Sequence, residues 1–427
     1  MVFLYPFWGL CAFVFLIPLE EAFLITEKMT FLKIIGLLVF FAWLAHILIK
    51  RDKLMIPQPF SIAFLLFGLW GLASTLWAQN TMVALERWVT MLLLVGFFFL
   101  VFQMANNIRK LYWLILSNIL GIVVAGALGL YNFFTIGLSP QQRISALINL
   151  QEGRYVQNPG HYGILLALGI FYFLVGFLFH SRGFIQRALY FAVFSGLLIA
   201  ALASGTRSFI ISFAIAFLAF LWYLWRIRAW GKGLSVGALA IVIIALVAAV
   251  MPPYFFQRVE SIWTTLGDRG AGRLDIWKIF LVEIAENPVL GVGLGNGPLR
   301  YDEYLTVAVA QYGVLLVHPG AWSTGRDPHS IYLQSWVELG VIGFILFMAL
   351  IVSLARQLYS ALRSAPLYSK EWQLGLVIAL NFIALLVTGI TEPSLIRKYL
   401  WFGFALIPVY ARLVKQLRSP WHTKEED

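Results

Sequence analysis

Twelve apolar runs, each close to the length that crosses a bilayer, recur along this chain and constrain its fold more than any other feature. A transmembrane helix needs about 20 mainly apolar residues. A soluble protein is excluded, because 61% of the residues are hydrophobic, 12% are charged and the mean hydropathy is +0.85. We therefore predict an all-α polytopic membrane protein with about 12 transmembrane helices. The runs are 3–19, 31–49, 59–77, 88–104, 111–136, 161–180, 188–203, 208–225, 233–251, 330–355, 372–391 and 396–414.

The N-terminal run is predicted to be a retained first span rather than a cleaved signal peptide. No basic residues precede it, and no small-residue cleavage signal follows it. Cys11 is the only cysteine and lies within this run, so neither a disulfide framework nor a cysteine-based zinc site is expected.

The distribution of Lys and Arg predicts how the chain is oriented. Seventeen of the 31 basic residues lie in one set of alternate connections, and the other set carries eight once the long segment 252–329 is set aside. Basic residues favour cytoplasmic connections, so both termini are expected in the cytoplasm. The net charge of +11 is then a topology signal, and the expected partners are membrane lipids rather than nucleic acid.

Three sections are predicted within one integrated membrane domain: 1–251 with helices 1–9, 252–329 as a periplasmic loop subdomain, and 330–427 with helices 10–12 and a cytoplasmic tail. Within the loop, 273–286 has the spacing of an amphipathic helix. Its apolar face is predicted to hold Leu274, Trp277, Phe280, Leu281 and Ile284, opposite Asp275 and Glu283. The glycine-rich stretch 287–298 should end this helix and form turns, and the whole loop is expected to be a lid-like subdomain.

The segment 327–356 is expected to run without a break from a polar entry into a membrane span that contains Glu338. An ionisable group costs about 2.5–3.5 kcal/mol at the centre of a span, so it marks a functional or tightly packed interior site. Gly340 and Gly343 are expected to permit close helix approach. Glu338 is half a turn out of phase with His329, so we expect it to brace this helix against another helix.

Polar residues gather at the outer ends of the predicted spans. Arg207 follows a very short turn and must lie at the depth of the bilayer interface. Arginines there often reach for lipid phosphates, but a guanidinium also binds phosphate oxygens in a bidentate manner. Arg273 opens a helix, and its alternative role is an exposed helix-start residue paired with an acid. The outer residues are Arg143, Arg154, Asn158, His161, Ser204–Arg207, Arg269, Arg273, His329, Glu392, Arg397 and Lys398.

His329 is the candidate general base, because its ordinary pKa of about 6.5 suits deprotonation of a sugar hydroxyl. Its alternative role is packing or helix capping. No phosphate-binding loop, nucleophile elbow or set of metal ligands has the required spacing, so neither a metal nor another cofactor is expected. Arginines with a base suit a substrate that already has a good leaving group, such as a diphosphate-linked sugar.

These residues resemble the O-antigen ligase and O-antigen polymerase superfamily. The resemblance rests on the order and spacing of short motifs between about 200 and 345: Ser204-Gly205-Thr206-Arg207, Gly272-Arg273 with Trp277, Glu286-Asn287-Pro288 with Gly291 and Gly293, and His329-Ser330 with Leu333, Glu338, Gly340 and Gly343. The chain departs from the pattern at Ser330, where the family more often has Asn.

The resemblance implies a metal-independent, inverting glycosyltransferase of the bacterial inner membrane with a GT-C-like fold and a periplasmic active site. The donor would be a polysaccharide on undecaprenyl diphosphate, and a ligase would transfer it to the lipid A-core oligosaccharide. By this resemblance, Arg207, Arg273 and His329 are the essential polar residues. Arg154 and Asn158 are similar to a further diphosphate-binding element. Glu338, Gly340 and Gly343 would give structural support.

Three other functions are compatible with parts of this pattern. A polymerase of the same superfamily would join two lipid-linked repeat units, and a protein O-oligosaccharyltransferase would modify proteins. A transporter would be expected to have paired broken helices and ionisable residues at mid-membrane. Here the ionisable residues gather at one outer face, which favours transfer chemistry.

Overall fold

The computed structural model describes residues 5–26, 29–50, 54–55, 60–136, 143–146, 148–149, 154–155, 157–180, 183–264, 272–316 and 319–417. All twelve apolar runs are mainly helical over the residues that it describes. Their helices are α1 (Pro6–Leu16), α2 (Phe31–Lys50), α3 (Phe60–Ala73), α4 (Thr81–Met104), α5 (Ile108–Ile136), α6 with α7 and η3 (Pro159–Leu165, Ala167–Val175 and Gly176–His180), α8 (Phe184–Ala203), α9 (Arg207–Arg226), α10 (Trp230–Val250), α14 (Ile331–Ser364), α15 (Lys370–Thr388) and α16 (Lys398–Leu417).

Nine helices of the described chain are long and apolar enough to cross a membrane; α1, α3 and α16 are not among them. The prediction of an all-α polytopic membrane protein is therefore confirmed, whereas the count of about 12 spans and the GT-C-like arrangement stay predictions. The strands in the described chain are short: β1 (Leu24–Thr26) pairs with β2 (Met29–Thr30), and β3 (Ile148–Asn149) pairs with β4 (Arg154–Tyr155). Short helices η1 (Ile17–Phe23) and η2 (Ser74–Leu76) follow α1 and α3.

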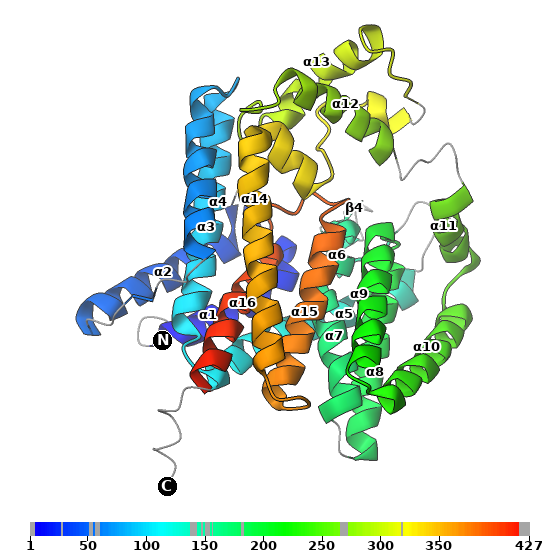
Figure 1. Cartoon of the computed structure of the whole chain (residues 1–427). Coiled ribbons are helices and arrows are strands. Elements are labelled where there is room, and N and C mark those ends of the chain that lie inside the picture. The colour runs from blue at the N-terminus through cyan, green and yellow to red at the C-terminus, as the bar shows by residue number, and fades with distance from the viewer. Residues whose placement is uncertain are drawn as a thin grey trace.

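The centre of the bundle is built by α14, α15 and α16. Helix α15 packs on α9 and α7, and α16 packs on α4 and α14. Trp372 of α15 and Trp401 of α16 are fully buried. Helices α2 and α10 lie at opposite edges of the bundle (Figure 1). The central helices are thus fixed on several sides, which gives rigid positions to the loops that follow them.

One end of the bundle is covered by the chain between α10 and α14, and we call it the capped end (Figure 1). This cover consists of α12 (Arg273–Glu286), α13 (Gly297–Ala310) and η4 (Pro319–Trp322), while α11 (Pro253–Thr264) lies beside it, next to α10 (Figure 1). Ile279 and Phe280 of α12, Tyr301 and Tyr304 of α13, and Val337 of α14 form its small apolar core.

Helix α12 has the predicted bounds, and Phe280 and Ile284 of its predicted apolar face are buried, but the rest of the predicted division into faces fails. Leu274 and Leu281 are about half exposed (48% and 52%), whereas Asp275 and Glu283 are fully buried. Asp275 is stabilised by an ion pair of 2.8 Å with Lys278. Helical spacing predicts one apolar stripe on α12. Packing against α13 and α14 determines which side of α12 is buried.

Helix α14 is broken at Gly340, which corrects the expected uninterrupted run from His329 into the span. Gly340 has φ 66° and ψ −172°, a conformation that is essentially restricted to glycine. The chain before it forms one helical segment and the chain after it forms the long segment that descends through the bundle (Figure 1). Glu338 therefore precedes the break and does not lie within the long segment.

The glycine-rich loop 287–297 satisfies the backbone groups that this break exposes. Val292 N donates to Val337 O (3.0 Å), and Gly293 N donates to Glu338 O (2.9 Å). Trp70 Nε1, from α3, donates a hydrogen bond to Leu339 O at 2.8 Å. Buried backbone groups need such partners. Loop 287–297 and the break at Gly340 therefore stabilise each other.

The close approach expected at Gly340 is made to a loop rather than to another helix. A Cβ on Gly340 would lie 2.0 Å from Val289 O. A Cβ on Gly343 would meet Leu339 of the same α14 at 2.1 Å. The nearest atoms at these two glycines thus belong to the loop and to α14 itself, and both positions exclude a larger side chain.

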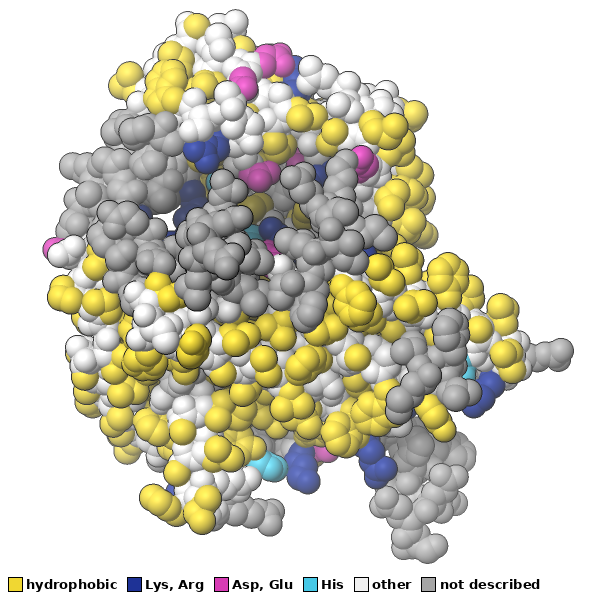
Figure 2. All heavy atoms as spheres, turned by 180° about the vertical axis from the view of Figure 1, so that it is seen from behind, with side chains coloured by type: hydrophobic (Ala, Val, Ile, Leu, Met, Phe, Trp, Pro, Cys, Tyr) yellow, Lys and Arg dark blue, Asp and Glu magenta, His cyan; other side chains and the backbone are white. Residues whose placement is uncertain are grey.

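The outer surface has a broad apolar belt, as expected for contact with lipid chains. Figure 2 shows this belt across the molecule and a recess next to it in which Lys, Arg, Asp, Glu and His side chains gather. Charged groups of the capped end therefore line a hollow on this face, and others, such as Asp302 and Glu303, lie on the exposed surface.

Candidate functional site

A buried carboxylate, Glu392, holds together two of the elements that carry predicted site residues. Glu392 follows α15 and is 6% exposed. Its Oε1 accepts a hydrogen bond of 2.8 Å from the guanidinium of Arg273, the first residue of α12. The same oxygen accepts a hydrogen bond of 3.0 Å from Ser208 Oγ, next to Arg207 at the start of α9. The starts of α9 and α12 therefore meet at one carboxylate.

The turn before Arg207 is fixed by its own polar residues. Thr206 Oγ1 donates to Pro159 O at 2.8 Å, which joins the turn to the start of α6. Arg143 donates to Ser204 O (2.8 Å) and to Thr206 Oγ1 (2.7 Å). Arg207 itself is half-buried. Arg143, which the sequence placed among the outer polar residues, thus helps to hold the turn that presents Arg207.

Helix α12 connects Arg273 with His329. One turn after Arg273, Trp277 Nε1 donates to Pro328 O at 2.9 Å. Pro328 immediately precedes His329, so the helix that carries the arginine also positions the backbone of the histidine. These two predicted site residues are 56 positions apart in sequence and are brought to one region by a single tryptophan contact.

The chain after His329 is anchored to the end of α15. Ile331 N donates to Gly389 O at 2.8 Å. Ser330 is the N-cap of α14, and its hydroxyl accepts from Leu333 N at 3.4 Å. Asn and Ser are both favoured N-caps, so the departure from the family pattern at Ser330 preserves the capping chemistry.

His329 adopts a left-handed backbone conformation with φ 47°. Its Nδ1 is buried, with no hydrogen-bond partner among the described residues. Burial is the main factor that lowers the pKa of His329, and Arg273 lowers it further, while Glu392 opposes this effect. A lowered pKa keeps the imidazole neutral at neutral pH, which is the state that can accept a proton.

Asn158 is the N-cap of α6, and Arg154 lies in β4. The Oδ1 of Asn158 accepts from Gly160 N at 2.8 Å, and Asn158 N donates to Glu21 at 2.8 Å. The side chain of Arg154 lies outside the described residues. His161, also on α6, contacts Tyr399 OH through Nδ1 at 3.1 Å. Roles for Asn158 and Arg154 in diphosphate binding stay predictions.

Glu338, Gly340 and Gly343 lie at the break of α14, beyond the first helical segment that follows His329. The carboxylate of Glu338 accepts from Gln334 Nε2 at 3.2 Å and from the backbone of Gly295. Across the fold, its hydrogen bond is made to the glycine-rich loop, and Arg87 of α4 interacts with it electrostatically. A supporting role for the three residues stays a prediction.

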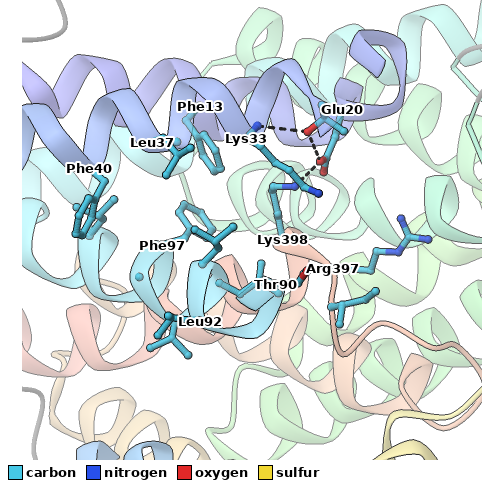
Figure 3. A pocket seen from close by; sticks show the side chains of 18 of the residues that line it. Phe13, Glu20, Lys33, Leu37, Phe40, Thr90, Leu92, Phe97, Arg397 and Lys398 are labelled. Atoms are coloured by element: carbon cyan, nitrogen blue, oxygen red, sulfur yellow. Dashed lines mark hydrogen bonds and ion pairs between the residues drawn. The ribbon is translucent and has the colours of Figure 1, made fainter. Parts of the chain in front are cut away.

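A large cavity lies beside this group of residues, and we call it the α2–α4 cavity. Its volume is about 1260 Å³. Apolar side chains of α1, α2 and α4 form most of its wall, and charged side chains lie at its other end (Figure 3). Asn158 and Pro159 also line it, so it reaches the start of α6 where Thr206 is held.

Glu392 is the candidate site residue whose central position the sequence does not predict. It was recognised as an outer polar residue, but nothing in the sequence paired it with Arg273. The available signal was a single acid in the turn between the last two apolar runs, close to Arg397 and Lys398. A carboxylate in such a turn needs a cationic partner if the turn is buried.

This arrangement combines cations, a neutral base and a buried carboxylate. The guanidinium groups can neutralise an anionic leaving group, and the imidazole can take a proton from an attacking hydroxyl. In the described part of the chain, no cluster of three His, Cys, Asp or Glu residues has the arrangement of a metal site.

Comparison with known proteins connects this region to a family. Residues 191–348 match the family model described as O-Antigen ligase. A Rickettsia conorii protein named as a candidate polysaccharide ligase is 34% identical over 88 residues, which cover 21% of this chain. The chain spans about a fifth (20%) of the length of that relative. The family match includes Arg207, Arg273 and His329 and ends before Glu392.

Proposed function

We propose that this chain, which carries an O-antigen ligase domain over residues 191–348, transfers a lipid-linked polysaccharide to a second lipid-linked sugar. The donor in this proposal is O-antigen polysaccharide on undecaprenyl diphosphate, and the acceptor is the lipid A-core oligosaccharide. The observation that carries the proposal is the convergence of the starts of α9 and α12 on Glu392, with Trp277 placing His329 beside them.

Arg207 and Arg273 bind the diphosphate of the donor in this proposal, with Arg154 and Asn158 as further contacts. A guanidinium stays charged at physiological pH and forms two parallel hydrogen bonds to phosphate oxygens. Charge that develops on the leaving diphosphate is thereby stabilised without a metal or another cofactor. Glu392 pairs with Arg273 and balances part of its charge.

His329 acts as the general base. It takes the proton of the acceptor hydroxyl while the hydroxyl oxygen forms its bond to the anomeric carbon. The bond between that carbon and the diphosphate oxygen breaks on the opposite face, so the configuration inverts. The proton ends on His329 and the bonding electrons end on the undecaprenyl diphosphate, which balances the reaction.

The proposed location is the bacterial inner membrane, with the capped end in the periplasm and both termini in the cytoplasm. Leu315 lies in the cover of the capped end and is 81% exposed. A single cysteine placed there, after Cys11 has been replaced by Ala, should react with an impermeant reagent added from the periplasmic side. Reaction from the cytoplasmic side alone would reverse the proposed orientation.

The most informative cellular test is the fate of O-antigen when the gene is removed. A ligase mutant should accumulate polysaccharide on undecaprenyl diphosphate and produce lipopolysaccharide without O-antigen. Lipopolysaccharide capped with single repeat units would instead identify a polymerase. Loss of glycoproteins with unchanged lipopolysaccharide would identify a protein O-oligosaccharyltransferase.

A further inference from the structure

The α2–α4 cavity has two chemically different ends. Phe13, Leu37, Phe40 and Phe97 form an apolar wall, whereas Lys33, Arg397 and Lys398 lie with Glu20 at the other end (Figure 3). A pocket that combines an apolar wall with a few convergent polar groups is the usual form of a ligand site. An amphiphile with one charged end matches this division.

The apolar wall continues onto the outer surface of the bundle. Leu37 and Phe41 of α2, and Leu92 and Leu93 of α4, line the cavity and are also 40–55% exposed. Exposed apolar side chains of a membrane helix contact lipid chains. A hydrocarbon chain can therefore enter this cavity sideways from the bilayer without crossing water.

The polar end carries an excess of positive charge. Among the described residues, five basic side chains line the cavity against two acidic ones, Glu20 and Glu21. Lys398 forms an ion pair with Glu20, and Arg397 lies 3.5 Å from Glu21. Both carboxylates are thus occupied, and a ligand with phosphate groups would neutralise the remaining charge. The basic residues are Lys33, Arg87, Arg143, Arg397 and Lys398.

The location of the polar end also favours a phosphate. Lys33 points toward Glu20, and Lys398 reaches the same carboxylate from the start of α16 (Figure 3). Thr30 Oγ1 donates to Glu20 Oε1 at 3.1 Å. Glu20 is therefore paired with the ammonium group of Lys398 and interacts electrostatically with Lys33 of another helix, so a dianionic group at this end could contact both cations.

We propose that the α2–α4 cavity binds a phosphate-bearing lipid, with its hydrocarbon chain between α2 and α4 and its phosphate at Lys33, Arg397 and Lys398. This inference rests on the proposed function in one respect: the lipid is one of the two lipid-linked substrates. Transfer between two lipid carriers requires two lipid sites, and Arg207, Arg273 and His329 do not line this cavity. Asn158 and Pro159, which do line it, connect it to the region where transfer would occur.

Photocrosslinking from inside the cavity tests the proposal. A benzophenone amino acid at Phe40 in the full-length protein should capture the bound lipid in nanodiscs of neutral phosphatidylcholine. Three arms add undecaprenyl diphosphate, a phosphorylated lipid A-core glycolipid or phosphatidylglycerol. The same probe at Ile62 of α3, which is 68% exposed, reports contact with bulk lipid. The proposal predicts that one of the first two lipids is captured at Phe40 and exceeds its capture at Ile62.

Charge variants supply the second readout. The double variant Lys33→Gln with Lys398→Gln should reduce capture at Phe40 by about tenfold or more, because charge-assisted contacts to phosphate are lost. Lys33→Arg with Lys398→Arg retains the charges and should retain most of the capture. Thermal unfolding of each variant identifies loss of folding. Equal capture of phosphatidylglycerol, or capture that is unchanged in a folded Gln variant, would overturn the proposal.

Failure of this inference is distinguishable from failure of the proposed function, because crosslinking requires no transfer. Capture of undecaprenyl diphosphate or the glycolipid by a protein that transfers no polysaccharide would refute the transfer and leave the lipid site. Normal transfer with no specific capture at Phe40 would refute the lipid site and leave the proposed transfer. In the active protein, the Gln variant should raise KM about tenfold for the lipid that is captured and leave KM for the other unchanged.

Discussion

Arg273 and Glu392 lie 119 residues apart in sequence and form an ion pair with a distance of 2.8 Å between Nη2 and Oε1. This pair is the point where the cover of the capped end meets the membrane bundle. A diphosphate that binds Arg273 must compete with Glu392 for the same guanidinium. Glu392 therefore controls both the position of Arg273 and the charge that surrounds His329.

Replacing Glu392 by Gln should separate binding from catalysis. The substitution keeps the shape but removes the negative charge that competes for Arg273 and favours protonated His329. We expect kcat to fall about tenfold, while KM for the donor stays equal or falls. Steady-state kinetics of purified protein measures both constants. A rise in KM with kcat unchanged would show that Glu392 only supports donor binding.

The pH profile gives the same variant a second test. His329 must be neutral to accept a proton, so activity should rise with pH through its pKa, which burial holds below the ordinary value. Asp327 and Glu392 raise this pKa, whereas Arg273 and Arg326 lower it. Loss of the Glu392 charge should therefore move the acid limb of kcat/KM to lower pH.

Controls for Glu392 use changes that retain its charge. Glu392→Asp and Ser208→Ala both keep a carboxylate in the site, and Ser208→Ala removes only a hydrogen bond of 3.0 Å. Their acid limbs should stay near that of the wild type. His161 on α6 also interacts with His329 electrostatically, so an unshifted limb in Glu392→Gln would assign the titration to another group.

Arg207→Lys tests whether the diphosphate is bound in a bidentate manner. Lys retains the charge but lacks the planar fork that contacts two phosphate oxygens. We expect kcat/KM for the donor to fall about tenfold to a hundredfold, with KM for the acceptor unchanged. Arg109, a basic residue of α5, provides a control position at which Lys should have no effect. Full activity of Arg207→Lys would contradict bidentate recognition.

Gly340→Ala should destabilise the junction between α14 and the glycine-rich loop. The added Cβ would lie 2.0 Å from Val289 O, and φ at this position is 66°. We expect a loss of about 1–3 kcal/mol, measured as a lower midpoint of thermal unfolding in detergent. Gly237→Ala on α10 is the matched control, because nothing lies within 4 Å of its added Cβ. Equal midpoints for the two variants would mean that the break is not needed.

Glu283→Gln should stabilise the cover at alkaline pH. Burial raises the pKa of Glu283 to about 9, and neither carboxylate oxygen has a hydrogen-bond partner among the described residues. Between its ordinary pKa and this value, the folded state holds a proton that the unfolded state has lost, so stability falls as pH rises.

The neutral Gln side chain removes this dependence. We expect a gain on the order of 1–3 kcal/mol at pH 8 and little difference at pH 4, where Glu283 is protonated in both states. Thermal unfolding at the two pH values measures the gain. A stability difference that is the same at both values would show that Glu283 does not titrate as described.

The helical bundle was predictable because each span is an apolar run of bilayer length. All twelve runs are mainly helical over the described residues, and α12 begins and ends where its spacing predicted. Local patterns could not identify which face of α12 is buried. Asp275 and Glu283 face the interior because α13 and α14 pack there, and that contact joins residues far apart in sequence.

The candidate site was predictable as a set of residue types at one end of the bundle, but not as an arrangement. Nothing in the sequence pairs Glu392 with Arg273, or Trp277 with Pro328. The break at Gly340 was also missed, because an apolar stretch with two glycines fits a continuous helix as well as an interrupted one. The backbone angles of Gly340 and its contacts with loop 287–297 identify the break in the structure.

The most direct test of the central claim is transfer by the purified protein. The assay supplies undecaprenyl-diphosphate-linked O-antigen and lipid A-core acceptor in the presence of a metal chelator. We expect the wild type to form the ligated lipopolysaccharide with inverted anomeric configuration. A folded His329→Ala variant should lose at least about a hundredfold in rate. Near wild-type transfer by His329→Ala would contradict the assignment of His329 as the base.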